Sequence, residues 1–172
     1  MREKTLCFSG HRPEKLPMSG DPSTPEMKRL ISMLFAEIKS SAEKGYDTFI
    51  SGMAKGTDLW AAKAVIELKD RHPGIRLVCA VPYKGYGDSW KGLDKWDLGI
   101  TLEAADEVVY ICQSYDKLCM KKRNEYMVDR SSKLIAVISD YKSGTGQTVR
   151  YAQRQGLEVK LIEPSSVQSL LL

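Results

Sequence analysis

The stretch Ser51-Gly52-Met53-Ala54-Lys55-Gly56-Thr57-Asp58 decides how this chain folds, because it joins two different sequence patterns. Before it, Thr48–Ser51 is a short apolar run with the composition of a buried strand. After it, a helical pattern begins at Thr57 or Asp58. Its apolar residues are Ala61, Ala62, Val65, Ile66 and Leu68. A strand, a glycine-rich turn and a helix in this order predict one unit of an α/β sheet.

The same alternation continues along nearly the whole chain. We expect strands in six apolar runs: Thr5–Ser9, Thr48–Ser51, Ile75–Val81, Glu107–Cys112, Leu134–Ser139 and Leu157–Ile162. Besides the helix after Gly56, we expect one opened by Pro25 and closed by Gly45, and others over Asp88–Ala104, Asp116–Ser131 and Gly146–Gln155. This pattern predicts an α/β, three-layer Rossmann-like domain, with helices on both faces of a mainly parallel sheet of about six strands.

Composition limits the class of protein. The 172 residues are 42% hydrophobic and 28% charged, which suits one globular domain over residues 1–172. The formal net charge of +4 is far from the basic stripe of a protein that binds duplex DNA. The sequence has neither a signal peptide nor the roughly 20 apolar residues of a membrane span, so we expect a cytoplasmic protein.

The cysteines and histidines do not form a metal-binding pattern. The four cysteines are Cys7, Cys79, Cys112 and Cys119, and no pair has CxxC spacing. Neither histidine supplies a complementary ligand spacing. We therefore expect reduced structural cysteines, no bound metal and no cofactor.

Three loops rich in small residues follow predicted strands. They are Ser9-Gly10-His11-Arg12-Pro13, Ser51–Asp58 and Ser143-Gly144-Thr145-Gly146-Gln147-Thr148. Ligands of parallel sheets bind outside the carboxyl ends of the strands, so these loops predict a single site at that edge. A glycine-rich turn that opens a helix also lets backbone N–H groups approach an anion. Capping and backbone freedom alone are the alternative explanation for such turns.

Polar side chains near these loops suggest how a ligand is held. Arg12 can place a guanidinium on a phosphate, with His11 beside it as a donor or a proton carrier. Asp58 can either cap its helix or accept hydrogen bonds from ribose hydroxyls. Arg123 and Asn124 can read phosphate and base if their helix leans over the same edge; otherwise they belong to a solvated face.

Aromatic residues crowd the segment after the third strand. Tyr83, Tyr86 and Trp90 alternate there with glycines, and such a flap can stack on a base, with core packing as the alternative.

The GxxxGxD spacing is neither the dinucleotide fingerprint GxGxxG nor a GxxxxGK[ST] phosphate loop, which argues against an ordinary dehydrogenase or ATPase. The full expected ligand-binding set is Gly10, His11, Arg12, Ser51, Gly52, Gly56, Thr57, Asp58, Arg123, Asn124, Ser143, Gly144, Thr145, Gly146 and Thr148.

Taken together, the loops resemble the SLOG superfamily, which contains DprA/Smf, the LOG phosphoribohydrolases and the stand-alone YpsA-like proteins. The YpsA-like branch is similar in size, in Ser9–Pro13 and in Ser51–Ala62. The DprA pattern SGxAxGxD is matched by Ser51, Gly52, Ala54, Gly56 and Asp58, and later DprA elements resemble Arg123-Asn124, Ser143-Gly144 and Thr148 with Ala152. The resemblance implies a nucleotide-type small-molecule ligand and, for some members, a sensor or regulatory role.

The resemblance also gives two rival functions. A LOG enzyme carries a PGGxGTxxE loop whose Glu works with an Arg, but here no Glu lies between Glu125 and Glu158. Glycosidic cleavage needs a carboxylate, so binding is favoured over hydrolysis, with Arg123 and Asp58 as the catalytic residues if the chain is an enzyme. Asp140 is a second substitute carboxylate. DprA-like binding of single-stranded DNA is the other rival, favoured by the +4 charge and the Lys121–Arg123 run.

We expect the phosphate to be held by backbone amides of Gly52–Thr57 and Gly144–Thr148 together with Arg12. Asp58 would take the ribose hydroxyls, and Arg123 would supply a second cation. The superfamily resemblance further implies a homodimer. The apolar tail Val167–Leu172 can pack on such a partner or cover an edge of the chain's own sheet.

Overall fold

The computed structural model describes residues 2–164 and contains one six-stranded sheet in which every neighbouring pair of strands is parallel. The strands are β1 (Thr5–Gly10), β2 (Thr48–Ser51), β3 (Arg76–Tyr83), β4 (Glu107–Cys112), β5 (Lys133–Val137) and β6 (Glu158–Ile162). Their order across the sheet is β4-β3-β2-β1-β5-β6. The direction of winding therefore reverses between β1 and β5, which is where open α/β sheets form a ligand crevice.

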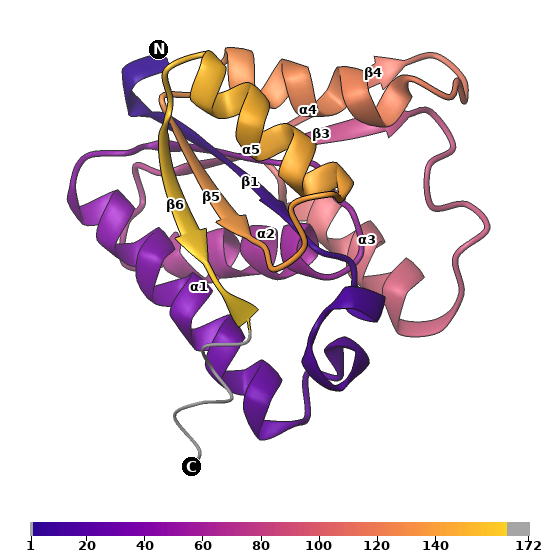
Figure 1. Cartoon of the computed structure of the whole chain (residues 1–172), viewed down its shortest axis with the longest axis horizontal. Coiled ribbons are helices and arrows are strands. Elements are labelled where there is room, and N and C mark those ends of the chain that lie inside the picture. Colours follow the sequence, from indigo (N-terminus) through magenta and orange to yellow (C-terminus); the bar gives the residue numbers. More distant parts are fainter. Residues whose placement is uncertain (1, 165–172) are drawn as a thin grey trace.

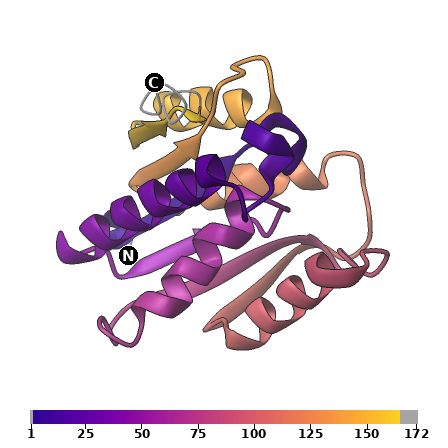
Figure 2. The ribbon, with the colours of Figure 1, turned by 90° about the horizontal axis from the view of Figure 1, so that it is seen from below.

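Five α-helices cover the two faces of this sheet. They are α1 (Pro25–Glu43), α2 (Thr57–Leu68), α3 (Gly92–Ala104), α4 (Cys119–Asp129) and α5 (Gly144–Arg154). Helices α1, α2 and α3 lie on one face, and α4 and α5 lie on the other (Figures 1 and 2). The predicted Rossmann-like α/β architecture is thus confirmed.

The central strand β1 shows why these segments read as continuous apolar runs. Leu6 and Phe8 belong to the hydrophobic cluster under α1 and α2, whereas Cys7 belongs to the cluster under α4 and α5. Because both faces of a central parallel strand are covered, polar residues have no exposed face to occupy. Helix α1 starts where the sequence indicates, since the Thr24 hydroxyl accepts a hydrogen bond from the backbone of Met27.

Some predicted boundaries were wrong. The helix expected over Asp88–Ala104 begins only at Gly92, because the preceding segment forms successive turns at Gly85 and Gly87, both with positive φ. Helix α4 is shorter than the expected Asp116–Ser131, and α5 begins two residues before the expected Gly146. Within residues 2–164, no helix is long and apolar enough to cross a membrane. The tail Val167–Leu172 lies outside the described residues.

Candidate functional site

The loops after β1, β2 and β5 meet at the carboxyl edge of the sheet and surround a cavity of about 330 Å³. Helix α4 closes one side of this cavity. Nine of the predicted site residues line it: Gly10, His11, Arg12, Asp58, Arg123, Asn124, Ser143, Gly144 and Thr145. Segments that are far apart in the sequence therefore form one pocket at the predicted edge.

Asp58 is the most unusual polar residue of the cavity. Its side chain is buried, with the residue only 4% exposed, and its Oδ2 accepts a hydrogen bond from the backbone N–H of Ala54 at 3.2 Å. Its Oδ1 has no hydrogen-bond partner within the described part of the chain. Ala54 precedes α2, so Asp58 does not cap that helix in the way considered above. Burial raises the pKa of Asp58, and the nearby positive charge of Arg123 opposes this rise.

Arg123 comes to the cavity from α4 and is 6% exposed. Its Nη1 donates to the carbonyl oxygen of Gly52 at 2.9 Å, while Nε and Nη2 both donate to Oδ1 of Asn124, at 3.1 and 3.0 Å. A Cβ on Gly52 would lie 2.9 Å both from Nε of Arg123 and from Oδ2 of Asp58. Helix α4 thus leans over the sheet edge, and the solvated-face alternative is wrong for Arg123.

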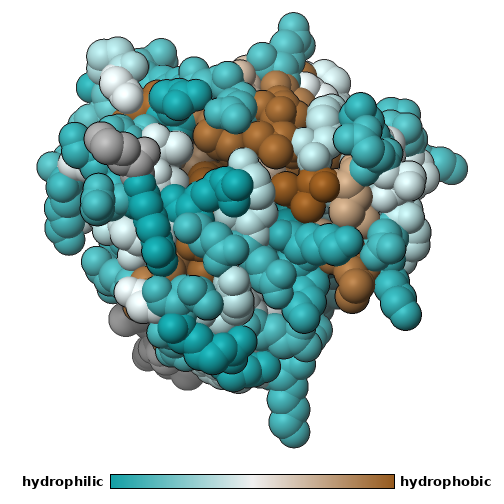
Figure 3. Space-filling view, turned by 90° about the horizontal axis from the view of Figure 1, so that it is seen from above, coloured by the Kyte–Doolittle hydropathy of each residue, from teal (hydrophilic) through white to brown (hydrophobic). Residues whose placement is uncertain are grey.

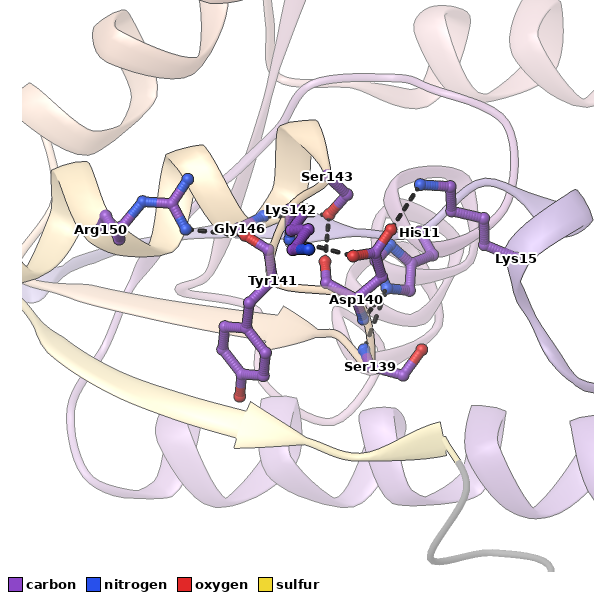
Figure 4. Close-up of polar contacts among 9 residues, drawn as sticks. All are labelled: His11, Lys15, Ser139, Asp140, Tyr141, Lys142, Ser143, Gly146 and Arg150. Carbon is purple, nitrogen blue, oxygen red and sulfur yellow. Dashed lines mark hydrogen bonds and ion pairs between the residues drawn. The ribbon is translucent and has the colours of Figure 1, made fainter.

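His11 ties two loops together. Its Nε2 accepts hydrogen bonds from the backbone N–H groups of Ser139 and Asp140, at 2.9 and 3.1 Å (Figure 4). Burial lowers the pKa of His11, and two donors on Nε2 place the proton of the neutral ring on Nδ1. Nε2 of His11 therefore does not serve a ligand as a donor or proton carrier, because it already accepts from the loop after β5. The expectation is corrected for this atom.

The loop after β5 is held by its own side chains (Figure 4). Ser143 caps α5, because its hydroxyl accepts from the backbone N–H of Gly146 at 3.2 Å and donates to the carbonyl oxygen of Asp140. The Asp140 carboxylate pairs with Lys15 at 2.9 Å and accepts from the backbone of Lys142 at 3.0 Å. Asp140 is thus committed to fixing this loop and does not line the cavity.

The remaining predicted residues do not line this cavity: Ser51, Gly52, Gly56, Thr57, Gly146 and Thr148. The Ser51 hydroxyl donates to the carbonyl oxygen of Asp58 at 2.8 Å, and the Thr57 hydroxyl donates to that of His11 at 3.2 Å. Between Gly52 and Thr57, Ala54 is the residue that lines the cavity. The loop after β2 therefore presents the Asp58 side chain to the pocket, in place of the row of backbone amides expected from its glycines.

The aromatic residues form an adjoining wall. Tyr83, Tyr86 and Trp90 pack edge-to-face, with ring centroids 5.5 Å apart in the first pair and 5.1 Å in the second. They line a second cavity of about 270 Å³ together with Arg12, Glu14, Lys55 and Met120. Arg12, Glu14 and Met120 line both cavities, so the aromatic wall lies beside the first pocket. Burial raises the pKa of Tyr86.

The sequence did not single out Lys15 or Met120 as site residues. Lys15 lies three residues after Arg12 within a short 3₁₀ turn, Pro13–Lys15, which returns it to the cavity. Met120 lies three residues before Arg123 and so shares its side of α4. The spacing from Arg123 is the signal that identifies Met120.

The chain is similar to curated bacterial proteins whose names state no activity. It is 33% identical over 144 residues to the uncharacterized SPbeta prophage-derived protein YoqJ of Bacillus subtilis, covering 76% of this chain and 84% of that one. It is 28% identical over 139 residues to a UPF0398 protein of Halalkalibacterium halodurans, covering 77% of this chain and 74% of the relative.

The fold is similar to two solved structures of DNA processing protein A. The Helicobacter pylori protein, whose structure concerns its single-stranded DNA binding mode, matches with a TM-score of 0.61 and 18% identity, over 91% of this chain and 64% of that one. The Streptococcus pneumoniae protein matches with a TM-score of 0.58 and 14% identity, over 91% and 49%. The sequence profile described as the YspA SLOG family matches residues 6–167. The chain therefore belongs to the YpsA family of SLOG proteins.

Proposed function

We propose that this protein binds a nucleotide or a nucleotide-derived small molecule at the carboxyl edge of its sheet and acts as a sensor or regulatory protein. The observation that carries the proposal is Oδ1 of Asp58, a buried carboxylate oxygen without a partner among the described residues, in a cavity that also holds Arg12 and Arg123. A buried acceptor without a donor is costly, and a ligand hydroxyl would satisfy it.

Each part of a nucleotide has a matching group. Arg12 is exposed and lines both cavities, where it can meet a phosphate together with Gly144 and Thr145 at the start of α5. Asp58 would accept from the ribose hydroxyls. The aromatic wall would contact the base, since its edge-to-face rings offer apolar surface beside Arg12, the residue that would hold the phosphate.

The role of Asp58 is tested by changing the ligand hydroxyls and the Asp58 side chain, separately and together. Titration calorimetry compares AMP with 2′,3′-dideoxy-AMP, first on the native protein and then on Asp58→Asn. A charge-assisted hydrogen bond contributes about 1.5–3 kcal/mol, so the native protein should prefer AMP by about tenfold or more. In Asp58→Asn this preference should shrink to about twofold or less. Equal affinity of the native protein for both ligands, or binding of neither, would count against the proposal.

Hydrolysis of a nucleoside 5′-monophosphate is a second candidate, favoured by the presence of Asp58 and Arg123 in one cavity. A carboxylate beside an anomeric carbon can stabilise oxocarbenium-like charge. Chromatography of AMP incubated with the protein would detect free adenine. The product must disappear in Asp58→Asn, and its absence with the native protein rejects this candidate.

Single-stranded DNA binding is a third candidate, supported by the likeness of the fold to DNA processing protein A. Binding through phosphates weakens steeply as salt is raised. A gel-shift series with an oligonucleotide at increasing salt tests this directly, and no shift at low salt removes the candidate.

A further inference from the structure

A groove between α4 and α5 adjoins the first cavity. It has a volume of about 450 Å³, and its lining residues come from α4, from α5 and from the turn before α4. Met120, Asn124 and Gly144 line the groove and the first cavity alike. The face that carries α4 and α5 is largely covered by hydrophilic side chains around a hydrophobic patch (Figure 3). Because Met120, Asn124 and Gly144 line both, a ligand can reach from the first cavity into this groove.

The groove is strongly cationic. Its positively charged side chains are Lys117, Lys121, Arg150 and Arg154, and Glu125 is the single carboxylate among the described lining residues. Arg150 and Arg154 lie four residues apart on α5 and so share one side of that helix, while Lys121 lies on α4 and Lys117 in the turn before it. Glu125 lies 3.8 Å from Lys121 and offsets one charge. The groove as a whole therefore favours an anion.

Three contacts shape the groove. Arg150 donates from Nη1 to the carbonyl oxygen of Tyr141 at 2.7 Å, which fixes its guanidinium against the loop before α5 (Figure 4). The Tyr151 hydroxyl donates to the Asp129 carboxylate at 2.7 Å and so links α5 to the end of α4. The guanidinium of Arg154 lies 5.8 Å from the centre of the Tyr151 ring. An aromatic ring and a cation thus lie together at the C-terminal end of α5.

The far end of the groove lies well beyond the first cavity. From Gly144 to Arg154, ten residues of α5 at 1.5 Å each extend about 15 Å. A mononucleotide bound by Arg12 and Asp58 would occupy the first pocket and leave the distal cations unused. Cations on both sides of the groove, Lys121 on α4 and Arg150 with Arg154 on α5, suit a ligand whose negative charges are themselves spread out.

We propose that the ligand is an elongated nucleotide derivative with a further phosphate beyond its first nucleotide unit, and that this phosphate lies in the α4–α5 groove. This inference rests on the proposed function of the first pocket. The distal phosphate can belong to a polyphosphate bridge or to a 3′–5′ phosphodiester. The two linkages share the same phosphate chemistry and can be compared directly.

Titration calorimetry on the full chain tests this with three small probes: AMP, diadenosine tetraphosphate and the 5′-phosphorylated dinucleotide pApA. The native protein should bind one of the two longer probes about tenfold or more tightly than AMP, and which one identifies the linkage. The double variant Lys121→Ala/Arg154→Ala should lose about tenfold for that probe and less than about twofold for AMP. A matched control, Lys28→Ala/Arg29→Ala, removes the same charge from exposed positions on α1 across the sheet and should bind like the native protein.

Other outcomes overturn the proposal in distinguishable ways. If AMP binds but neither longer probe binds more tightly, or if the groove variant binds the longer probe like the native protein, the groove inference is wrong and the first pocket stands. If a single-stranded 12-mer depends on Lys121 and Arg154 while the small probes do not, the groove serves nucleic acid and not a small ligand. If no probe binds, AMP included, both the groove inference and the proposed function are wrong.

Discussion

Arg123 donates from Nη1 to the carbonyl oxygen of Gly52 at 2.9 Å, although 71 residues separate the two in the sequence. This contact joins α4 to the loop after β2 and brings a buried guanidinium close to the Asp58 carboxylate. The approach is possible because Gly52 carries no Cβ. The pocket therefore depends on packing at one glycine as much as on the charged groups themselves.

Replacing Gly52 by Ala should damage the pocket. The new Cβ would stand 2.9 Å from Nε of Arg123 and from Oδ2 of Asp58, so both groups must move. We expect AMP affinity to fall by about tenfold or more, with a loss of about 1–3 kcal/mol in unfolding free energy from overpacking. Gly99→Ala is the control, since nothing lies within 4 Å of its Cβ position and Ala favours its helix. If Gly52→Ala binds AMP with native affinity, the close approach of Arg123 and Asp58 to Gly52 does not matter for binding.

Asp58→Asn should make the protein more stable while it loses affinity. Because burial raises the pKa of Asp58, its ionised form opposes folding at neutral pH, and stability falls as pH rises through the folded-state pKa. An uncharged amide removes this loss, and each kcal/mol gained raises Tm by about 2–4 °C. Asp140→Asn should not raise Tm, since the hydrogen bond from Lys15 lowers the pKa of Asp140. Thermal unfolding at pH 7 checks both, and a lower Tm for Asp58→Asn would contradict the account.

His11 should make stability depend on pH. Burial lowers the pKa of His11 below its ordinary value of 6.5, so the unfolded chain takes up a proton where the folded protein does not. Its contribution to stability is complete above that value and is lost as pH falls through the folded-state pKa. His11→Gln keeps an acceptor without titrating, and urea unfolding between pH 7 and pH 5 should show a smaller loss than in the native protein. An equal loss in both proteins would place the effect elsewhere, and His72→Gln controls for removal of a histidine.

Lys133 should matter for stability and not for binding. This side chain at the start of β5 is 2% exposed and donates to Glu37 at 2.8 Å and to the Ser41 hydroxyl at 3.1 Å, which fastens α1 to the sheet. Lys133→Ala leaves Glu37 without its partner and should cost about 3–5 kcal/mol. The double variant Lys133→Met/Glu37→Leu should recover much of this loss in urea unfolding. A cost below about 1 kcal/mol for Lys133→Ala would show that the pair is not needed.

The sequence predicts most of the fold because central parallel strands are buried on both faces and leave unbroken apolar runs. It misplaced the start of α3, where turns at Gly85 and Gly87 override a helix-compatible composition. It also began the fifth strand at Leu134, because a lysine is rarely buried and the partners of Lys133 are distant in the sequence.

The candidate site is predictable where loop position alone decides it. Arg12, Asp58 and Gly144 follow strands whose carboxyl ends must share one edge, so their convergence is expected. The bonds from the loop after β5 to His11 and the pair of Lys15 with Asp140 are not predictable, because they join residues more than 120 positions apart. The same holds for the orphaned Oδ1 of Asp58, which only tertiary packing creates.

A crystal structure of the protein grown with a saturating nucleotide tests the central claim most directly. The account predicts density in the pocket at the carboxyl edge, with a phosphate within hydrogen-bond distance of Arg12 and a ribose hydroxyl donating to Oδ1 of Asp58. Density for the nucleotide on any other face of the molecule, with Asp58 still unpartnered, would contradict it.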